Sequence, residues 1–307
     1  MVDRATVDRA VIDQEMVDRF VELGYLVVPG LVGSDDVARI NAELPRFARG
    51  DYPVANPEQL LVGATEDESL RHLLCVHFPH WVNPVFAAMV RHPGLAGVLS
   101  GIVGAHLAGW DGRVKAMQSM LFVKPPGMPG QAWHQDEHFI PTRDRSLCGA
   151  WIALDDATVD NGCLWVVPGS HRTGMLHPVR AHTRPDLYDP APEAYDATDP
   201  QGPGFDAAGA LPVPVAAGDV VFFNGYLLHS SLPNRTEGQY RRALVNHYCN
   251  AWSPLPWSVP GVASGPPDYR AVVPVVGDDP YAWKGYAPHP GTVYLRPHAA
   301  AGQEGGR

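Results

Sequence analysis

The amino-acid sequence predicts a mainly β fold with flanking α-helices, either an antiparallel sandwich or a jelly roll that lies behind an N-terminal helical layer. Helical patterns occupy the first part of the chain, up to about residue 110, and short β-rich runs divided by turn residues begin at about residue 115. No helical pattern falls between the later runs, so parallel βαβ winding is not expected.

The helical layer is predicted from start and stop signals around short apolar patterns. We expect Asp13 to cap a first helix that carries Phe20 and Val21 on one face and stops at Gly24. Residues 25–28 then form a β-rich run. The other predicted helices are one capped by Ser34 that ends near Pro45, one from Pro84 through Val90, and one from Pro93 to about Ile102.

The β-rich part of the chain is divided by strong turn signals, such as Asp160-Asn161-Gly162 and Gly218-Asp219. A proline-rich segment, residues 177–216, interrupts the strands, and a loop of this length in a compact domain predicts a lid or a wall of a substrate pocket. The tail after Tyr294 is expected to be frayed. The predicted strands are 117–124, 132–138, 147–154, 163–167, 220–224 and 241–249.

Composition places the chain among ordinary globular proteins and disfavours several classes of partner. Hydrophobic residues make up 45% of the 307 residues and charged residues 18%, with a net charge of −10 when histidine is neutral. This acidic balance without a local basic patch disfavours a nucleic-acid partner. The chain contains no uninterrupted apolar run of about 18 residues, so no membrane span is expected. The charged residues 1–14 do not resemble a secretory signal.

The four cysteines are scattered and form no Cys-x-x-Cys pair. Three of them, Cys148, Cys163 and Cys249, lie within apolar runs. Buried free thiols are therefore expected rather than disulfides, and a reducing cytoplasmic location is the corresponding expectation.

Two residues of the run 132–138 could hold a metal ion. Residues two apart in a strand point to the same face, so His134 and Asp136 would present an imidazole and a carboxylate side by side. His229, soon after the predicted strand 220–224, could supply a second imidazole, because a jelly roll brings distant strands together. Two histidines and one carboxylate form the facial triad that holds Fe(II) and leaves positions open for substrates.

An arginine pair follows the third candidate ligand. Arg241 and Arg242 begin an alternating strand, so one of them can face the interior of the fold. A buried guanidinium needs an anion or a buried partner, and its planar fork suits a carboxylate. A dicarboxylate co-substrate would meet this need.

These motifs together resemble the phytanoyl-CoA dioxygenase family of Fe(II)/2-oxoglutarate-dependent oxygenases. The resemblance extends from Gly24-Tyr25 to about Trp252. It is densest in Met120, Lys124-Pro125-Pro126, His134-Gln135-Asp136, Gly149-Ala150-Trp151, Asn161-Gly162-Cys163-Leu164 and Pro168-Gly169-Ser170-His171, and again in His229-Ser230-Ser231, Asn234 and Arg241-Arg242-Ala243.

The resemblance implies a double-stranded β-helix (jelly-roll or cupin-like) core and three cofactors or co-substrates, which are Fe(II), 2-oxoglutarate and O2. It implies that the whole chain, residues 1–307, is one dioxygenase domain. Within it we expect the helical layer at about 10–110, the core at about 115–255 with the lid insertion 177–216, and a C-terminal extension at 256–307.

By the same resemblance, His134, Asp136 and His229 would be the iron ligands and the catalytic centre. Arg241 would bind the distal carboxylate of 2-oxoglutarate, and Ser231 would hydrogen-bond near it. The loop before the arginine pair is one residue longer than is usual in the family, which keeps Arg242 as an alternative.

Two further positions, Met120 and Trp151, match family positions near the co-substrate, and Gln135 is a third candidate because it lies between two ligands. Met120 and Trp151 would line its pocket, and Gln135, between two ligands, would touch its surroundings. The presence of Asp136 also matters, because related halogenases carry a small residue there. The implied reaction is therefore hydroxylation or another oxidation, coupled to decarboxylation of 2-oxoglutarate to succinate and CO2.

The substrate is expected to be a small organic molecule, and the lack of a Lys/Arg cluster for CoA phosphates favours a free metabolite. Two other functional classes remain open. A cupin-type hydrolase or isomerase could use the triad without 2-oxoglutarate, and a non-catalytic relative could bind a ligand only. The oligomeric state is open as well.

Other polar residues receive simpler interpretations. His138 is expected either at a substrate entrance or in an ordinary loop, and Asp155-Asp156 is expected in a solvated turn. Ser170-His171 lacks the nucleophile elbow of a hydrolase. His77, His80 and Trp81 lie among apolar residues and are expected to be structural.

Overall fold

A computed structural model of the protein describes residues 12–182, 184–192, 209–253, 272–284 and 288–298. The helices are α1 (Gln14–Leu23), α2 (Ser34–Arg49), α3 (Glu66–His72), α4 (Pro84–Val90) and α5 (Pro93–Ile102), with the short 3₁₀-helices η1 (Pro57–Gln59), η2 (Pro79–Trp81), η3 (Asp136–His138), η4 (Ser170–Thr173) and η6 (Ala282–Lys284). The strands are β1 (Tyr25–Val28), β2 (Leu73–His77), β3 (Val114–Lys124), β4 (Gly130–Gln131), β5 (Cys148–Ala153), β6 (Leu164–Val166), β7 (Val179–Arg180), β8 (Leu187–Tyr188), β9 (Ala191–Pro192), β10 (Leu211–Val213), β11 (Val220–Asn224), β12 (His229–Ser231), β13 (Arg241–Asn250), β14 (Val273–Val276) and β15 (Tyr294–Pro297).

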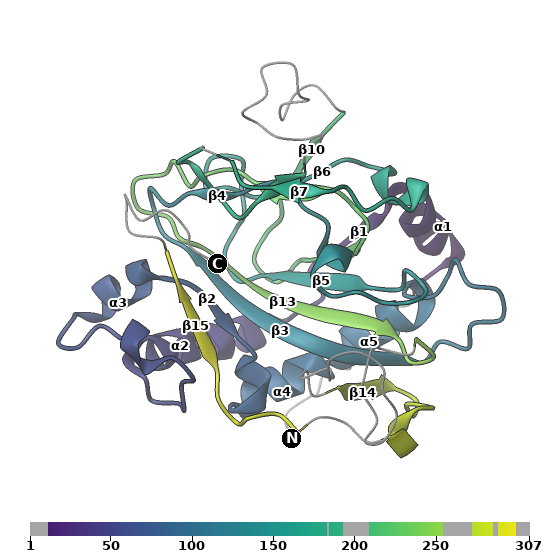
Figure 1. Cartoon of the computed structure of the whole chain (residues 1–307), viewed down its shortest axis with the longest axis horizontal. Helices are drawn as coiled ribbons and strands as arrows, with labels where there is room; N and C mark the ends of the chain where they lie inside the picture. The colour runs from purple at the N-terminus through teal and green to yellow at the C-terminus, as the bar shows by residue number, and fades with distance from the viewer. Residues whose placement is uncertain (1–11, 183, 193–208, 254–271, 285–287, 299–307) are drawn as a thin grey trace, which may run out of the picture.

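The elements form layers, with helices on one face of a large antiparallel sheet and smaller sheets over its other face. In Figure 1, α2, α4 and α5 lie below β3 and β13, and β4, β6 and β10 lie above them. The large sheet has the order β1-β11-β5-β13-β3-β2-β15, with β14 added beside β3. A second sheet has the order β10-β6-β12. The predicted jelly-roll architecture behind a helical layer is confirmed.

The first helix follows its sequence signals closely. The Asp13 carboxylate accepts a hydrogen bond from the Met16 backbone N–H at 2.8 Å, and Gly24 ends α1 with a φ of 81°. Phe20 packs into the core, whereas Val21 is exposed, so the predicted apolar face is narrower than expected.

The second helix departs from its prediction at both ends. Gly33, not Ser34, is the N-cap residue, and no side chain caps the helix. The helix also continues through Pro45 to Arg49, although an internal proline removes one backbone hydrogen bond. Burial of Leu44 and Phe47 against the core outweighs that loss.

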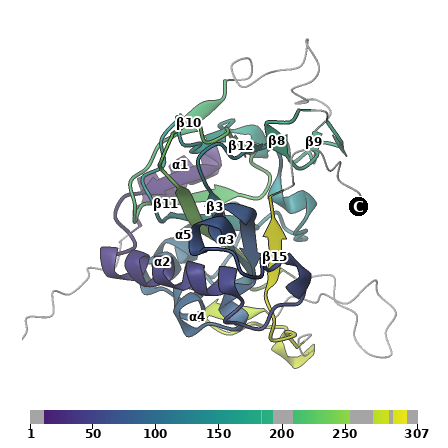
Figure 2. The ribbon, with the colours of Figure 1, turned by 90° about the vertical axis from the view of Figure 1, so that its left-hand side faces the viewer.

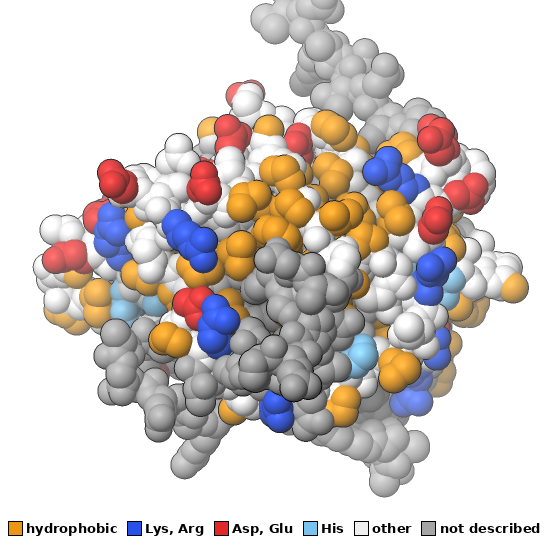
Figure 3. All heavy atoms as spheres, turned by 90° about the horizontal axis from the view of Figure 1, so that it is seen from above, with side chains coloured by type: hydrophobic (Ala, Val, Ile, Leu, Met, Phe, Trp, Pro, Cys, Tyr) orange, Lys and Arg blue, Asp and Glu red, His pale blue; other side chains and the backbone are white. Residues whose placement is uncertain are grey.

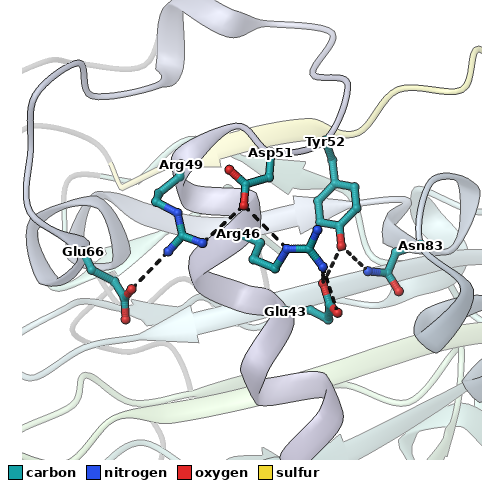
Figure 4. A network of polar contacts seen from close by, with 7 residues as sticks. All are labelled: Glu43, Arg46, Arg49, Asp51, Tyr52, Glu66 and Asn83. Atoms are coloured by element: carbon teal, nitrogen blue, oxygen red, sulfur yellow. Dashed lines mark hydrogen bonds and ion pairs between the residues drawn. The ribbon is translucent and has the colours of Figure 1, made fainter.

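A polar network ties the end of α2 to the segments that follow it (Figure 4). Arg49 pairs with Glu66 of α3 at 3.1 Å. The Tyr52 hydroxyl donates to Glu43 and accepts from the Asn83 side chain, which also caps α4. These contacts hold the helical layer together on its polar side, while its apolar residues pack in one core with those of the sheet. Figure 2 shows α2 and α4 from the side.

Residues Pro84–Ile102 are long and apolar enough to cross a membrane by length and composition only. In the fold they are two separate helices, α4 and α5, because a turn at Arg91 and His92 divides them. Both helices contact β3, and Phe86 and Leu95 lie fully inside the core.

Two predictions are wrong, one for a strand and one for the C-terminal tail, because tertiary contacts decide the structure of both segments. The run 132–138 is not a strand, since His134 makes a single bridge to His229 and Asp136 begins η3. The segment 294–297 is not frayed but pairs as β15 with β2. Of the predicted C-terminal extension, residues 256–271, 285–287 and 299–307 lie outside the described residues.

The proline-rich insertion is described only in part. Residues 183 and 193–208 lie outside the described residues, and the remainder forms β7 to β10. Tyr188 and Asp189 of this insertion line the main cavity, in agreement with the expected pocket wall. Figure 3 shows the face above the small sheets, where apolar side chains gather near the centre and charged ones lie toward the edge.

Candidate metal and co-substrate site

The three candidate ligands converge between the two sheets. Their ligand atoms all lie within 4.8 Å of one another, and all three residues are buried. His134 Nε2 and His229 Nε2 lie 3.5 and 3.6 Å from the same carboxylate oxygen of Asp136. The expected side-by-side placement of His134 and Asp136 is therefore present, although a turn after Gln135 and not a strand produces it.

Backbone contacts fix both imidazoles in one orientation. The Nδ1 atoms of His134 and His229 each lie 2.9 Å from the carbonyl oxygen two residues earlier, those of Ala132 and Leu227. Since a carbonyl only accepts, each Nδ1 carries a proton, and each Nε2 faces Asp136 as the nitrogen that could bind a metal. Burial lowers the pKa of His229 to about 4, so this imidazole is neutral near pH 7.

Asp136 is held as a carboxylate by its neighbours. Burial alone would raise its pKa, but His229, His247 and His134 together hold the pKa well below its usual range. His247 Nε2 donates to the second carboxylate oxygen at 2.9 Å. Two imidazole Nε2 atoms and one carboxylate, which a further histidine orients, form a donor set that fits a divalent metal ion such as Fe(II).

A cavity of about 320 Å³ extends from these ligands. Met120 and Trp151 line it, as the resemblance implies, and so does Arg241. Further lining residues come from β2, β3, β13, β15 and the insertion; they include His77, Gln118, Tyr188, Asp189, His247 and Arg296.

Arg241 is a buried cation without an anionic partner among the described residues. It is 4% exposed, its Nε atom has no hydrogen-bond partner, and its guanidinium lies 5.6 Å from the centre of the Trp151 ring. Arg242 instead points away and forms a two-point ion pair with Asp155. This pair corrects the prediction that Asp155 lies in a merely solvated turn.

Ser231 and Gln135 do not line the cavity in the described structure. The Ser231 hydroxyl accepts from the buried Lys124 ammonium at 2.7 Å. The Gln135 side chain donates to the carbonyls of Met175 and Tyr226 and accepts from the His177 backbone N–H. Gln135 therefore braces the loop after η4, because its amide is fully used by backbone groups.

The turn at Gly162, beside the Lys124 ammonium group, leaves no room for a side chain. A Cβ atom at Gly162, which has a φ of 84°, would lie 2.3 Å from the Leu232 carbonyl oxygen and 3.0 Å from Lys124 Nζ. Glycine at this turn thus allows Lys124 to reach Ser231 and the Leu232 carbonyl, both at 2.7 Å.

Sequence reasoning missed several cavity residues. His77 was expected to be structural, but it lines the cavity, because β2 pairs with β3 beside Met120. His80 does fit the structural expectation, since its ring contacts the Ser119 hydroxyl. His138 is exposed and does not line the cavity, whereas its neighbours Phe139 and Ile140 do. All four cysteines are free and buried, as predicted.

Comparison with known proteins decides the family. A model of the phytanoyl-CoA dioxygenase (PhyH) family matches residues 20–243. The chain belongs to the phytanoyl-CoA dioxygenase family. Phytanoyl-CoA dioxygenase 1 of Oryza sativa subsp. japonica is 32% identical over 186 residues, which cover 59% of this chain and 60% of the relative. The peroxisomal phytanoyl-CoA dioxygenase of Rattus norvegicus is 29% identical, over 75% of this chain and 66% of the relative.

Solved structures agree with the phytanoyl-CoA dioxygenase fold. The non-heme alpha ketoglutarate dependent carbocyclase SnoK from nogalamycin biosynthesis is 26% identical with a TM-score of 0.58, and the match covers 83% of this chain and 93% of SnoK. EctD from S. alaskensis, solved with 2-oxoglutarate and 5-hydroxyectoine, is 22% identical with a TM-score of 0.57, over 80% of this chain and 78% of EctD. The chain spans 60% or less of the first three curated relatives, from Oryza sativa, Caenorhabditis elegans and Arabidopsis thaliana.

Proposed function

We propose that this protein is an Fe(II)- and 2-oxoglutarate-dependent dioxygenase that oxidises a small organic molecule, by hydroxylation or a related oxidation. The observation that carries the proposal is that the triad and a buried Arg241 without an anionic partner among the described residues line one cavity. Membership of the phytanoyl-CoA dioxygenase family supports it.

The chain's residues would divide the work between metal and co-substrate. His134, Asp136 and His229 would hold Fe(II), which supplies the oxidising chemistry with 2-oxoglutarate and O2 when bound. Arg241 would bind the distal carboxylate of 2-oxoglutarate, since its guanidinium otherwise remains a buried charge without compensation. Trp151 packs beside that guanidinium and excludes water from it.

The Nε2 atoms of His134 and His229 face one carboxylate oxygen of Asp136, as a shared metal ion would require. His247 would keep Asp136 aimed at the metal, because it occupies the second carboxylate oxygen. The apolar walls formed by Phe122, Leu164 and Val245 would keep bulk water away from the reacting groups.

A cupin-type hydrolase or isomerase would use the same triad without 2-oxoglutarate. That alternative leaves Arg241 unexplained, because among the described residues no carboxylate lies within ion-pair distance of it. The observation therefore favours the dioxygenase.

Turnover of 2-oxoglutarate tests the proposal. The purified protein with Fe(II), ascorbate and O2 should release succinate slowly even without a primary substrate. Asp136→Ala should lose that release while keeping its folded circular-dichroism spectrum. Metal-dependent hydrolysis or isomerisation without consumption of 2-oxoglutarate would contradict the proposal.

A further inference from the structure

The cavity lining extends beyond Arg241 to polar side chains that the proposed function leaves without a role. On the large sheet, Arg241 pairs with Lys124, whereas His77 on β2 pairs with Met120 and Tyr294 toward the β15 edge. This remaining part of the lining, called the substrate half below, includes His77, Gln118, Phe139, Ile140, Asp189 and Arg296. By strand register Arg296 lies on the side nearer Arg241, because it pairs with Cys75, which pairs with Phe122. The inference rests on the proposed function, because it assumes that 2-oxoglutarate lies beside Arg241.

The one full cation of the substrate half, among the described residues, is already neutralised. Arg296 forms a two-point ion pair with Asp189, and its guanidinium lies 5.5 Å from the centre of the Tyr188 ring. The Gln131 side chain donates to the same carboxylate at 3.2 Å. Because Arg296 belongs to β15 and Asp189 to the insertion, this ion pair joins the C-terminal strand to the insertion. Arg296 lies outside residues 20–243, which match the family model.

The remaining polar side chains of the substrate half are uncharged, and the half-buried His77 ring packs edge-on against Tyr294. Neither the His77 imidazole nor the Gln118 amide makes a side-chain hydrogen bond within the described part of the chain. Gln118 is only 8% exposed. Burial, and then the charge of Arg296, lower the pKa of His77 to about 4, so His77 is neutral near pH 7. Because both side chains face the cavity and make no side-chain hydrogen bond among the described residues, they are available to a ligand with hydrogen-bonding groups.

We propose that the primary substrate is an uncharged small molecule with hydroxyl or amide groups, which hydrogen-bonds to His77 and Gln118 and packs its apolar part on Phe139 and Ile140. A neutral molecule needs no counter-charge, and the side chains offer uncharged donors and acceptors. A carboxylate or a CoA phosphate in the same place would lie next to Asp189 and find no unpaired cation.

Three probes that share a six-carbon acyl chain but differ in the charge of the head group test whether the site prefers an uncharged ligand. Binding of 2-oxoglutarate to the anaerobic Fe(II)-loaded full chain is first measured by equilibrium dialysis. Hexanamide, hexanoate and hexanoyl-CoA are then each dialysed against this complex in the same dialysis chambers. Hexanamide should bind in a saturable way and at least about tenfold more tightly than hexanoate or hexanoyl-CoA.

Variants connect the preference to named residues. Asp189→Asn releases Arg296 and should shift the preference toward hexanoate by about tenfold or more, and Asp189→Asn with Arg296→Gln should restore the preference for hexanamide. Gln118→Leu and His77→Leu should each weaken hexanamide binding about three- to tenfold, the usual loss for one hydrogen bond, with 2-oxoglutarate binding unchanged. Gln14→Leu, an exposed change on α1, serves as the matched control.

The outcomes separate this inference from the proposed function. If wild-type protein takes up 2-oxoglutarate but prefers hexanoate or hexanoyl-CoA, or shows no saturable hexanamide binding, the inference is overturned and the dioxygenase stands. If 2-oxoglutarate itself does not bind, both fail together. An unchanged preference in Asp189→Asn also contradicts the inference, because the ion pair would then not set the charge of the site.

Discussion

Arg242 and Asp155 form a two-point ion pair, with the Arg242 Nε and Nη2 atoms 2.8 and 2.6 Å from the two carboxylate oxygens. The Arg242 backbone N–H donates to the same carboxylate at 2.9 Å. The neighbouring Arg241 has no such partner within the described residues and faces the cavity. Arg242 therefore stabilises the beginning of β13, and Arg241 is available to a bound anion.

Arg241→Ala should weaken 2-oxoglutarate binding by at least about 2 kcal/mol, which is about thirtyfold, because a buried two-point contact to a carboxylate is lost. Calorimetric titration of 2-oxoglutarate into the metal-loaded protein measures this change. Arg242→Ala is the matched control: it should cost about 1 kcal/mol of stability and leave 2-oxoglutarate affinity unaltered. The reverse pattern would place the carboxylate contact at Arg242.

His247→Phe should lower the affinity for Fe(II) about 10- to 100-fold, because Asp136 loses the donor that orients it. Competition with a coloured chelator under anaerobic conditions gives the affinity. His138→Phe, a change at an exposed histidine close in sequence, should have no effect. Equal metal affinity in His247→Phe and wild type would mean that Asp136 is oriented by other groups.

Gln135→Leu should lower the free energy of unfolding by about 2–3 kcal/mol, because it leaves backbone groups near Met175 and Tyr226 without partners. Affinity for 2-oxoglutarate should change little, since Gln135 does not line the cavity. Urea unfolding and co-substrate titration together test both parts. A large loss of co-substrate affinity with unchanged stability would instead support the direct contact that family resemblance implies.

His80 should contribute to acid sensitivity. Burial lowers its folded-state pKa from 6.5 to about 4, so the folded protein binds fewer protons than the unfolded chain between these values. The stabilising contribution is complete above pH 6.5 and is lost as the pH falls toward 4, with a slope of at most about 1.4 kcal/mol per pH unit. His80→Asn, which can keep a contact with Ser119, should flatten the stability profile there. An identical slope in the variant would contradict this.

The sequence predicted elements with local signals well. Helix α1 has a capping aspartate and a terminal glycine, and β11 and β13 have uninterrupted or alternating apolar patterns. Such signals act within a few residues, so they can be recognised without tertiary contacts. The residue types of the triad were recognisable for a similar reason, because His134 and Asp136 are close in sequence.

Features that depend on distant partners were not predictable. Strand β15 exists because it pairs with β2, more than 200 residues earlier in the chain. Strand alternation predicted that either Arg241 or Arg242 faces the interior. The ion pair between Arg242 and the distant Asp155 shows that Arg241 is the interior one. The roles of His77 and Arg296 in the cavity likewise arise from sheet order and from the insertion, which leave no local pattern.

The most direct test of the central claim is an anaerobic titration of the metal-free protein with Fe(II) and then 2-oxoglutarate, followed by visible absorption. The account predicts a weak charge-transfer band that requires both components and that is lost in Asp136→Ala. It also predicts that Arg241→Ala needs much more 2-oxoglutarate to develop the band. No band with wild-type protein, together with metal analysis that finds zinc in the purified chain, would contradict the account and favour a jelly-roll metalloenzyme that does not use 2-oxoglutarate.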